Sequence, residues 1–303
     1  MNTYGAEQGL VWHTEFRDGH VPAGYEQLRG FERALSLLPE GVKKVRLRSD
    51  TAAYQQELLR YCAAGKHPRL GRIEFALSCD GTREFKEAVA EVPKSEWPPL
   101  YREHHGKRVK TGPEWAEVCF VPNQMSHSKG GPAYRYWALR EPLRQLELPG
   151  MEGQRALPFP SLEINRQSYK LFGIVTNRDW RGDRLMAWQH ERCGKSEEAH
   201  KVMKEDLAGG QRPSGDLGAN AAWGWIMVLA LNLNGAMKQL VLEPGWEHRR
   251  MKALRFALIH LSGRILNRSR QWIIRLGKNG SAYRLLIGAR QKILQLAHSP
   301  TGT

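Results

Sequence analysis

The sequence predicts an α/β protein: a mixed sheet with flanking helices, an inserted antiparallel β segment and a basic helical C-terminal region. Three observations lead to this fold class. Strand-like and helix-like segments alternate through residues 1–80. Short strand-like stretches broken by prolines fill residues 81–181, and basic residues between apolar ones at helical spacing fill residues 241–303. We therefore expect a core formed by residues 1–80 and 182–240, interrupted by the insertion 81–181 and followed by the C-terminal region.

Residues 1–80 carry the first elements of this core. Their hydrophobic periodicity predicts strands at 9–16, 43–50 and 72–79 and helices at 26–39 and 54–62. In the second strand Val45 and Leu47 alternate with basic residues, and the strand ends in Asp50. A carboxylate at the carboxyl end of a buried strand is a favoured place for chemistry. Asp is also a good helix N-cap and a helix-like stretch follows, so both roles stay open.

The insertion reads as an antiparallel sheet of short strands and turns. Strands are expected at residues 117–122, 134–141 and 169–177. Aromatic residues gather in it: Trp97, Trp115, Tyr134, Tyr136 and Trp137. Aromatic rings beside basic residues can stack on flipped or single-stranded bases. The alternative, which we favour for each single residue, is the aromatic core of a small sheet.

Residues 188–210 read as one helix that ends at a Gly pair. Glu197 and Lys204 are seven residues apart, so two helical turns place them on one face. A carboxylate can hold a divalent cation and an ammonium can hold a phosphate, which suits metal-assisted phosphoryl chemistry on nucleic acid. The alternative is a solvated helix with ordinary Glu/Lys pairs, and charge alone favours it.

The basic excess of the chain is concentrated near its C-terminus. Lys and Arg total 46 against 31 Asp and Glu, a net charge of +15. Between Trp246 and Lys292 there are twelve Lys and Arg residues and one acid, Glu247. A merely soluble surface would mix both signs. We therefore expect packed helices whose basic outer face contacts DNA or RNA, with candidate contacts at Arg249, Arg250 and Arg255.

Other classes of protein receive little support. The four cysteines are widely spread without a C-x-x-C pair, which argues against structural zinc and a disulfide framework. The apolar run from Ala221 is too short and too rich in Asn for a membrane span, so a buried helix is expected. No motif of a serine hydrolase or of a P-loop NTPase is present in the sequence.

The strand that ends in Asp50, the long insertion and the helix that carries Glu197 follow one another along the chain. This order resembles that of the DDE-type transposases of bacterial insertion sequences. In that family a strand ends in the second catalytic Asp, within a motif of Asp, two small residues and an aromatic. Residues 50–54 (DTAAY) match, with the aromatic displaced by one residue. The third acid lies on a helix with the pattern Tyr-x2-Arg-x3-Glu-x6-Lys. Glu197 and Lys204 match it, whereas His190 and Cys193 occupy the Tyr and Arg positions.

Two more segments contribute to the resemblance, which runs from about residue 9 to the C-terminus. They are Val175–Asn177 and the Asn-rich apolar helix from Ala219. The resemblance implies an RNase H-like core with an inserted β-rich segment. It also implies an enzyme that cleaves and joins DNA strands at the ends of a mobile element, with two Mg²⁺ (or Mn²⁺) ions bound when intact.

The resemblance also implies roles for particular residues and partners. Asp50 and Glu197 would be catalytic metal ligands that approach each other at one edge of the sheet, with Glu198 as the alternative acid. Phosphate contacts would come from Lys204, Arg192 and Lys195. The partners would be element ends and target DNA, bound by a homodimer in the bacterial cytoplasm, associated with the nucleoid and not with a membrane.

The first catalytic Asp of the family has no counterpart here. Only Asp18 precedes Asp50, and it lies in a Gly/Pro-punctuated turn that corresponds to a later position in the family. The chain therefore resembles the C-terminal part of a transposase, and alone it is expected to lack catalytic activity. The alternative is a DNA-binding or assembly protein, derived from a transposase, that performs no catalysis.

Overall fold

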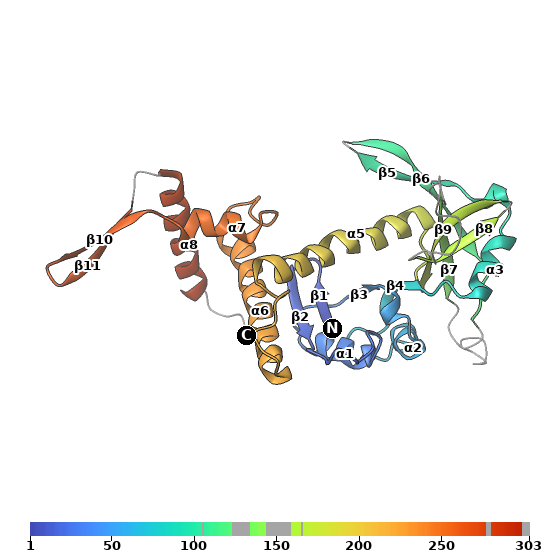
Figure 1. Ribbon diagram of the computed structural model, residues 1–303, viewed down its shortest axis with the longest axis horizontal. Coiled ribbons are helices and arrows are strands. Elements are labelled where there is room, and N and C mark those ends of the chain that lie inside the picture. The colour runs from blue at the N-terminus through green and yellow to red at the C-terminus, as the bar shows by residue number, and fades with distance from the viewer. Residues whose placement is uncertain (105, 123–133, 144–158, 165, 277–279, 299–303) are drawn as a thin grey trace. The chain divides into compact units, whose positions relative to one another are not determined.

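The computed structural model describes residues 1–104, 106–122, 134–143, 159–164, 166–276 and 280–298 (Figure 1). The chain divides into two compact units. We call Gly19–Gly194 the sheet unit, and Met1–Asp18 together with Lys195–Thr303 the terminal unit. These units divide the chain at places other than the domain boundaries expected from the sequence, and those domains stay predictions.

The sheet unit is built on one mixed sheet of seven strands. They are β3 (Arg46–Ser49), β4 (Glu74–Cys79), β5 (Pro99–His104), β6 (Lys107–Val118), β7 (Arg135–Pro142), β8 (Ser161–Ile164) and β9 (Gln167–Thr176). The order is β3-β4-β9-β7-β6-β5, with β8 paired to β9. β3 and β4 are parallel, and the other neighbours are antiparallel. The expected mixed sheet is confirmed, and the strands of the insertion continue it.

Helices cover both faces of this sheet. They are α1 (Gln27–Ser36), α2 (Gln56–Ala64), α3 (Arg83–Glu91) and the first part of α5 (Gly182–Lys201), with 3₁₀ turns η1 (Thr51–Ala53) and η2 (Lys94–Glu96). In β4, Phe75 and Leu77 belong to a core shared with α1, α2 and α3. Ala76, between them, packs in a second cluster with Leu185 and Met186 of α5. Successive strand residues point to opposite faces, so α5 lies on the face opposite α1, α2 and α3.

The aromatic residues of the insertion belong to this core. Trp97, Tyr136 and Trp137 are all at most 5% exposed. Trp115 lies against Trp137 with ring centroids 5.5 Å apart. The structure thus supports the core interpretation of these residues over base stacking. The strand expected at 117–122 lies earlier in the chain than predicted: β6 spans Lys107–Val118, so only the first two residues of the expected strand belong to it.

The terminal unit joins the two ends of the chain. Its elements are β1 (Asn2–Gly5), β2 (Leu10–Thr14), the end of α5, α6 (Leu217–Ala236), α7 (Met251–Leu254), β10 (Gly263–Arg268), β11 (Gln271–Leu276) and α8 (Gly280–His298), with π-turns η3 (Val202–Asp206), η4 (Met237–Val241) and η5 (Arg255–Ile259). Val11 of β2 packs against Val202 and Val228. Asn232 of α6 accepts from the Val11 N–H (2.8 Å) and donates to the Val11 carbonyl (2.9 Å), which fixes the β1–β2 hairpin to α6.

Two expectations for the terminal unit need correction. The apolar helix α6 is present, but within this unit it is not fully buried, because Ile226, Leu229 and Leu233 are each more than half exposed. The C-terminal region was expected to be helical throughout, yet β10 and β11 form an antiparallel hairpin. A run of β-branched and aromatic residues, Trp272–Ile274, favours a strand there over a helix.

Candidate functional site

Asp50 follows β3 and caps the turn after it. Its side chain is exposed, and Oδ1 accepts a hydrogen bond from the Ala52 N–H at 3.1 Å. The capping role is therefore real, although the capped element is η1 and not α2. β3 is an end strand of the sheet and runs parallel to β4. Asp50 thus lies at the carboxyl end of an edge strand, and its catalytic role stays a prediction.

The middle of α5 contacts the end of β3. Gln189 Nε2 donates to the Ser49 carbonyl at 2.9 Å, one residue before Asp50. The Arg48 guanidinium donates to the Trp188 carbonyl and pairs with Glu191 at 3.2 Å. These contacts hold the helix against the strand end that carries the predicted catalytic Asp. No local pattern in the sequence points to Gln189, because its amide finds its partner only when the helix packs against the strand.

A stack of aromatic rings and an arginine anchors the same part of α5. The Arg178 guanidinium lies 3.2 Å from the Trp180 ring centroid and 4.8 Å from that of Trp188. Its side chain is 3% exposed and pairs with Glu74 of β4 at 3.4 Å. At the helix start, Gly182 packs so closely on Trp115 that an added Cβ would lie 2.3 Å from its ring. α5 is therefore locked to the sheet before it reaches the acids predicted to be catalytic.

The predicted acidic pair lies further along α5, in the terminal unit. Glu197 is exposed, and no described residue forms an ion pair or hydrogen bond with it. Glu198 is also exposed, but its charge acts on two residues of the same unit. The pKa of Tyr4 is raised by burial and then by Glu198. The pKa of Lys238 is lowered by burial, which Glu198 opposes.

The helix does not continue to the Gly pair in regular α form. α5 spans Gly182–Lys201, starting earlier than the expected residue 188, and Val202–Asp206 form the π-turn η3. The Leu207 N–H donates to the Val202 carbonyl, five residues back, at 3.1 Å. A π-turn rotates Lys204 away from the position that a straight α-helix would give it relative to Glu197. Lys204 is exposed.

The other predicted phosphate contacts differ in how available they are. Arg192 is half-buried and already has an interaction partner, and the side chain of Lys195 lies outside the described residues. Arg250 pairs with Asp206 at 2.7 Å and with Glu205 at 3.0 Å. The Arg249 guanidinium lies 4.6 Å from the Trp246 ring centroid. Arg255 is exposed in η5. Of this set, Arg250 is already neutralised within the chain.

The described residues do not complete a two-metal site. Among them, no group of three or more His, Cys, Asp or Glu side chains is placed to hold a metal ion. Asp50 belongs to the sheet unit and Glu197 to the terminal unit. Their expected approach to a shared metal therefore stays a prediction, and we assign no catalytic step to a metal here.

A match to a protein family bears on the classes of protein considered above. Residues 161–298 match the family described as transposase DDE domain group 1. The match confirms the predicted resemblance to DDE-type transposases. It covers β8 to α8 and includes Glu197 and Lys204, whereas Asp50 lies before it. None of the curated proteins matches the chain.

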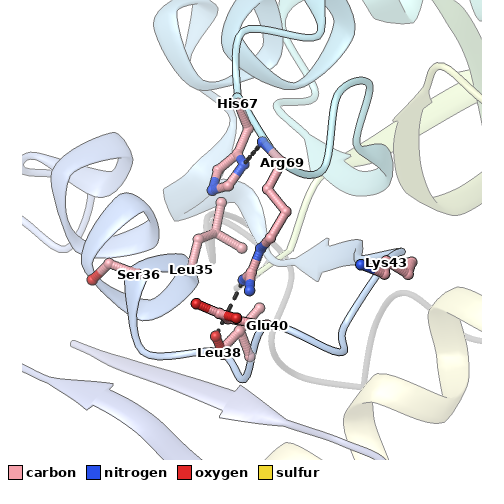
Figure 2. Close-up of a pocket in the computed structure, with 7 residues that line it drawn as sticks. All are labelled: Leu35, Ser36, Leu38, Glu40, Lys43, His67 and Arg69. Carbon is pink, nitrogen blue, oxygen red and sulfur yellow. Dashed lines mark hydrogen bonds between the residues drawn. The ribbon is translucent and has the colours of Figure 1, made fainter.

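Transposases of this kind act on DNA and in general use divalent metal ions. No helix within the described part of this transposase-like chain is long and apolar enough to cross a membrane. A shallow hollow in the sheet unit is lined by residues outside the predicted site, among them Leu35, His67 and Arg69. Figure 2 shows Arg69 reaching to Leu38, whose carbonyl it contacts at 3.2 Å, so this arginine supports the fold.

Glu74, which anchors Arg178 under α5, makes the sheet unit sensitive to acid. Burial opposes ionisation of Glu74, but hydrogen bonds from Lys44 and Arg46 and the charge of Arg178 outweigh it, so its pKa is below the ordinary 4.5. A carboxyl with a lowered pKa stabilises the fold above its unfolded pKa and loses this contribution as pH falls through the folded pKa.

We expect Glu74→Gln to lower the thermal stability of the sheet unit at pH 7 and to flatten its decline below pH 4.5. The variant also leaves the buried Arg178 without its acid, which is costly in a dry site. Circular dichroism melts from pH 7 to pH 3 measure both effects. The matched control is Glu87→Gln, which removes an exposed pair with Arg83 and should change little. Equal effects of the two substitutions would contradict this account.

Proposed function

We propose that this chain is part of an insertion-sequence transposase that cleaves and joins DNA strands at element ends with divalent cations. The observation that carries the proposal is the family match over the segment that contains Glu197 and Lys204. In this proposal Asp50 and Glu197 are metal ligands, and phosphates of the DNA are held by Lys204, Arg192 and Lys195. The active assembly on DNA is a homodimer.

The surroundings of the two neighbouring acids favour Glu197 over Glu198. Glu197 is exposed and unpaired among the described residues, as a carboxylate that receives a cation must be. Glu198 lies close enough to Tyr4 and Lys238 to influence their pKa values. Its charge is therefore engaged with the Lys238 ammonium of the terminal unit, to which it is attracted.

A third carboxylate is needed for two closely spaced cations. Among the described residues β3 pairs only with β4, so its other edge is open to a further strand. A strand paired there could end beside Asp50. We propose that such a strand supplies the missing carboxylate, from a further part of the same polypeptide or from another chain.

The proposal is tested by a cleavage assay with Mg²⁺ or Mn²⁺ on DNA that carries the element's ends. The chain alone is expected to bind this DNA without cutting it, because Asp50 and Glu197 provide two of three carboxylates. A polypeptide extended upstream by an in-frame strand ending in Asp should cut. In that longer protein Asp50→Ala or Glu197→Ala should lower the rate by 1,000-fold or more, on the order of removing a group that binds the reacting centre.

Two substitutions serve as matched controls in the cleaving protein. Asp80 is exposed and follows β4 as Asp50 follows β3, so Asp80→Ala tests whether any strand-end acid matters. Glu198→Gln tests whether Glu198, and not its neighbour Glu197, is the catalytic acid on α5. Both should keep most of the activity. Metal-dependent nicking by the present chain that disappears in Asp50→Ala would show that a third carboxylate from outside is not required. Cleavage that survives both Asp50→Ala and Glu197→Ala would overturn the site.

A further inference from the structure

We propose that the hairpin formed by β10 and β11 binds the DNA phosphate backbone through one arginine-rich face. We call this hairpin, Gly263–Leu276, the basic ribbon. The inference rests on the proposed function and deepens it, because it assigns the main DNA contact of the terminal unit to a β element. The residues that carry it, Arg264 and Arg275, lie outside the predicted set of phosphate contacts.

The pairing register divides the ribbon into two unlike faces. Arg264 pairs with Arg275, and Ile265 pairs with Ile274. Residues directly opposite share a face, and successive residues alternate. One face therefore carries Arg264, Leu266, Arg268, Gln271, Ile273 and Arg275, and the other carries Ile265, Asn267, Trp272 and Ile274. The ribbon presents its charge on a single side.

The charge of this face is not balanced within the chain. Arg264, Arg268, Arg270 and Arg275 are all exposed, and no described residue forms an ion pair or hydrogen bond with their side chains. No Asp or Glu follows Glu247 in the sequence. Like charges directly opposite in a β ladder are destabilising, so the pair Arg264–Arg275 costs stability in the unbound protein. A polyanion lying on this face would remove that repulsion.

The two arginines that precede α7, Arg249 and Arg250, are placed differently. Arg250 pairs with Asp206 and Glu205, and Arg249 stacks on Trp246. These contacts fix the start of α7 within the terminal unit. The contrast indicates that the basic residues of this region serve two purposes. Arg250 joins the start of α7 to η3 through its ion pairs, whereas the arginines of the basic ribbon are available to contact DNA phosphates.

The shape of the ribbon fits a nucleic acid groove. A two-stranded ribbon can enter the major groove of B-DNA, which is about 12 Å wide. The two turn residues, Ser269 and Arg270, both have positive φ angles, 52° and 63°. Positive φ angles at both central residues give a two-residue turn whose twist matches that of the flanking strands. Asn and Gly adopt this conformation more readily than Ser and Arg. An exposed arginine is thus held at the ribbon tip at a cost in backbone strain.

The test compares salt dependence of DNA binding by the full chain and by Arg264→Gln/Arg275→Gln. The probe is a fluorescent 30-base-pair duplex of arbitrary sequence, followed by anisotropy from 50 to 300 mM salt. Each lost phosphate contact lowers the slope of log K against log salt by about 0.9. We expect the slope to fall by about 1.8, with roughly tenfold weaker binding per contact at 0.1 M salt.

Three control variants make the result specific. Arg29→Gln/Arg83→Gln removes the same charge from the sheet unit and should leave most of the slope. Ile265→Thr/Ile274→Thr alters the opposite, exposed face of the ribbon and should also preserve it. Arg264→Lys/Arg275→Lys keeps the charge and should keep the slope. Circular dichroism verifies that each variant is folded as the parent is.

The possible outcomes separate this inference from the proposed function. Absence of DNA binding by the parent chain at every salt concentration would remove the nucleic-acid part of the proposed function. A parent that binds, with a slope that Arg264→Gln/Arg275→Gln leaves unchanged, would overturn the ribbon assignment alone. Loss of binding only in Ile265→Thr/Ile274→Thr would also overturn it and would point to an apolar contact between copies of the chain.

Discussion

The affinity of this chain for duplex DNA is expected to fall about 1,000-fold or more between 50 and 200 mM salt. The net charge is +15, and twelve Lys and Arg residues lie between Trp246 and Lys292 beside one acid. Each phosphate neutralised by such a side chain releases condensed counterions, and this release becomes less favourable as salt rises. Six or more contacts produce a loss of this size. Fluorescence anisotropy with a labelled duplex measures it.

The control for this prediction is a second duplex of the same length and unrelated sequence. Phosphate contacts carry no sequence information, so both duplexes should show the same slope. An affinity that is insensitive to salt would contradict the account of the basic C-terminal region. A steep slope for one duplex and a flat slope for the other would show that base contacts dominate.

The sequence predicted those elements whose periodicity is local. β4 and β9 have apolar runs bounded by polar residues, and both are strands as expected. α5 was expected because of its length and the Gly pair that follows it, and Glu197 lies on it. Asp50 was expected at the end of a strand over 43–50 because Val45 and Leu47 alternate with basic residues. It directly follows β3, which is shorter than expected and spans Arg46–Ser49.

Other features depend on packing between distant segments, so the sequence could not show them. The insertion was expected to contain antiparallel strands, but nothing local says that β9 pairs with β4 and continues the same sheet. The contact of Gln189 with Ser49 joins residues that are far apart in the chain. The basic ribbon was missed because Arg264 and Arg268 are four residues apart, a spacing that also fits the basic face of a helix.

Asn177 shows how a motif read as a family signature serves the fold. Its side chain accepts from the Phe75 N–H at 2.8 Å and donates to the Ile73 carbonyl at 2.9 Å. The preceding Thr176 donates to the Phe75 carbonyl at 2.6 Å. The segment Val175–Asn177 therefore supplies hydrogen-bond partners to the start of β4 where β9 ends. This junction lies beside Arg178, which anchors α5.

Asn177→Ala is expected to destabilise the sheet unit by about 2–6 kcal/mol, since it leaves two buried polar groups unpaired and each costs about 1–3 kcal/mol. Phe75 and Ile73 are fully buried, so water cannot replace the amide. Asn232→Ala is the matched comparison, because Asn232 makes the same two bonds to Val11 but is only half-buried. It should cost less and act on the terminal unit.

Hydrogen exchange followed by mass spectrometry distinguishes the two substitutions. Asn177→Ala should accelerate exchange at Phe75 and along β4, while Asn232→Ala should accelerate exchange at Val11. Urea unfolding of each variant gives the change in free energy. A loss below about 1 kcal/mol for Asn177→Ala, which is the worth of a single solvated hydrogen bond, would show that the β4–β9 junction does not depend on this amide.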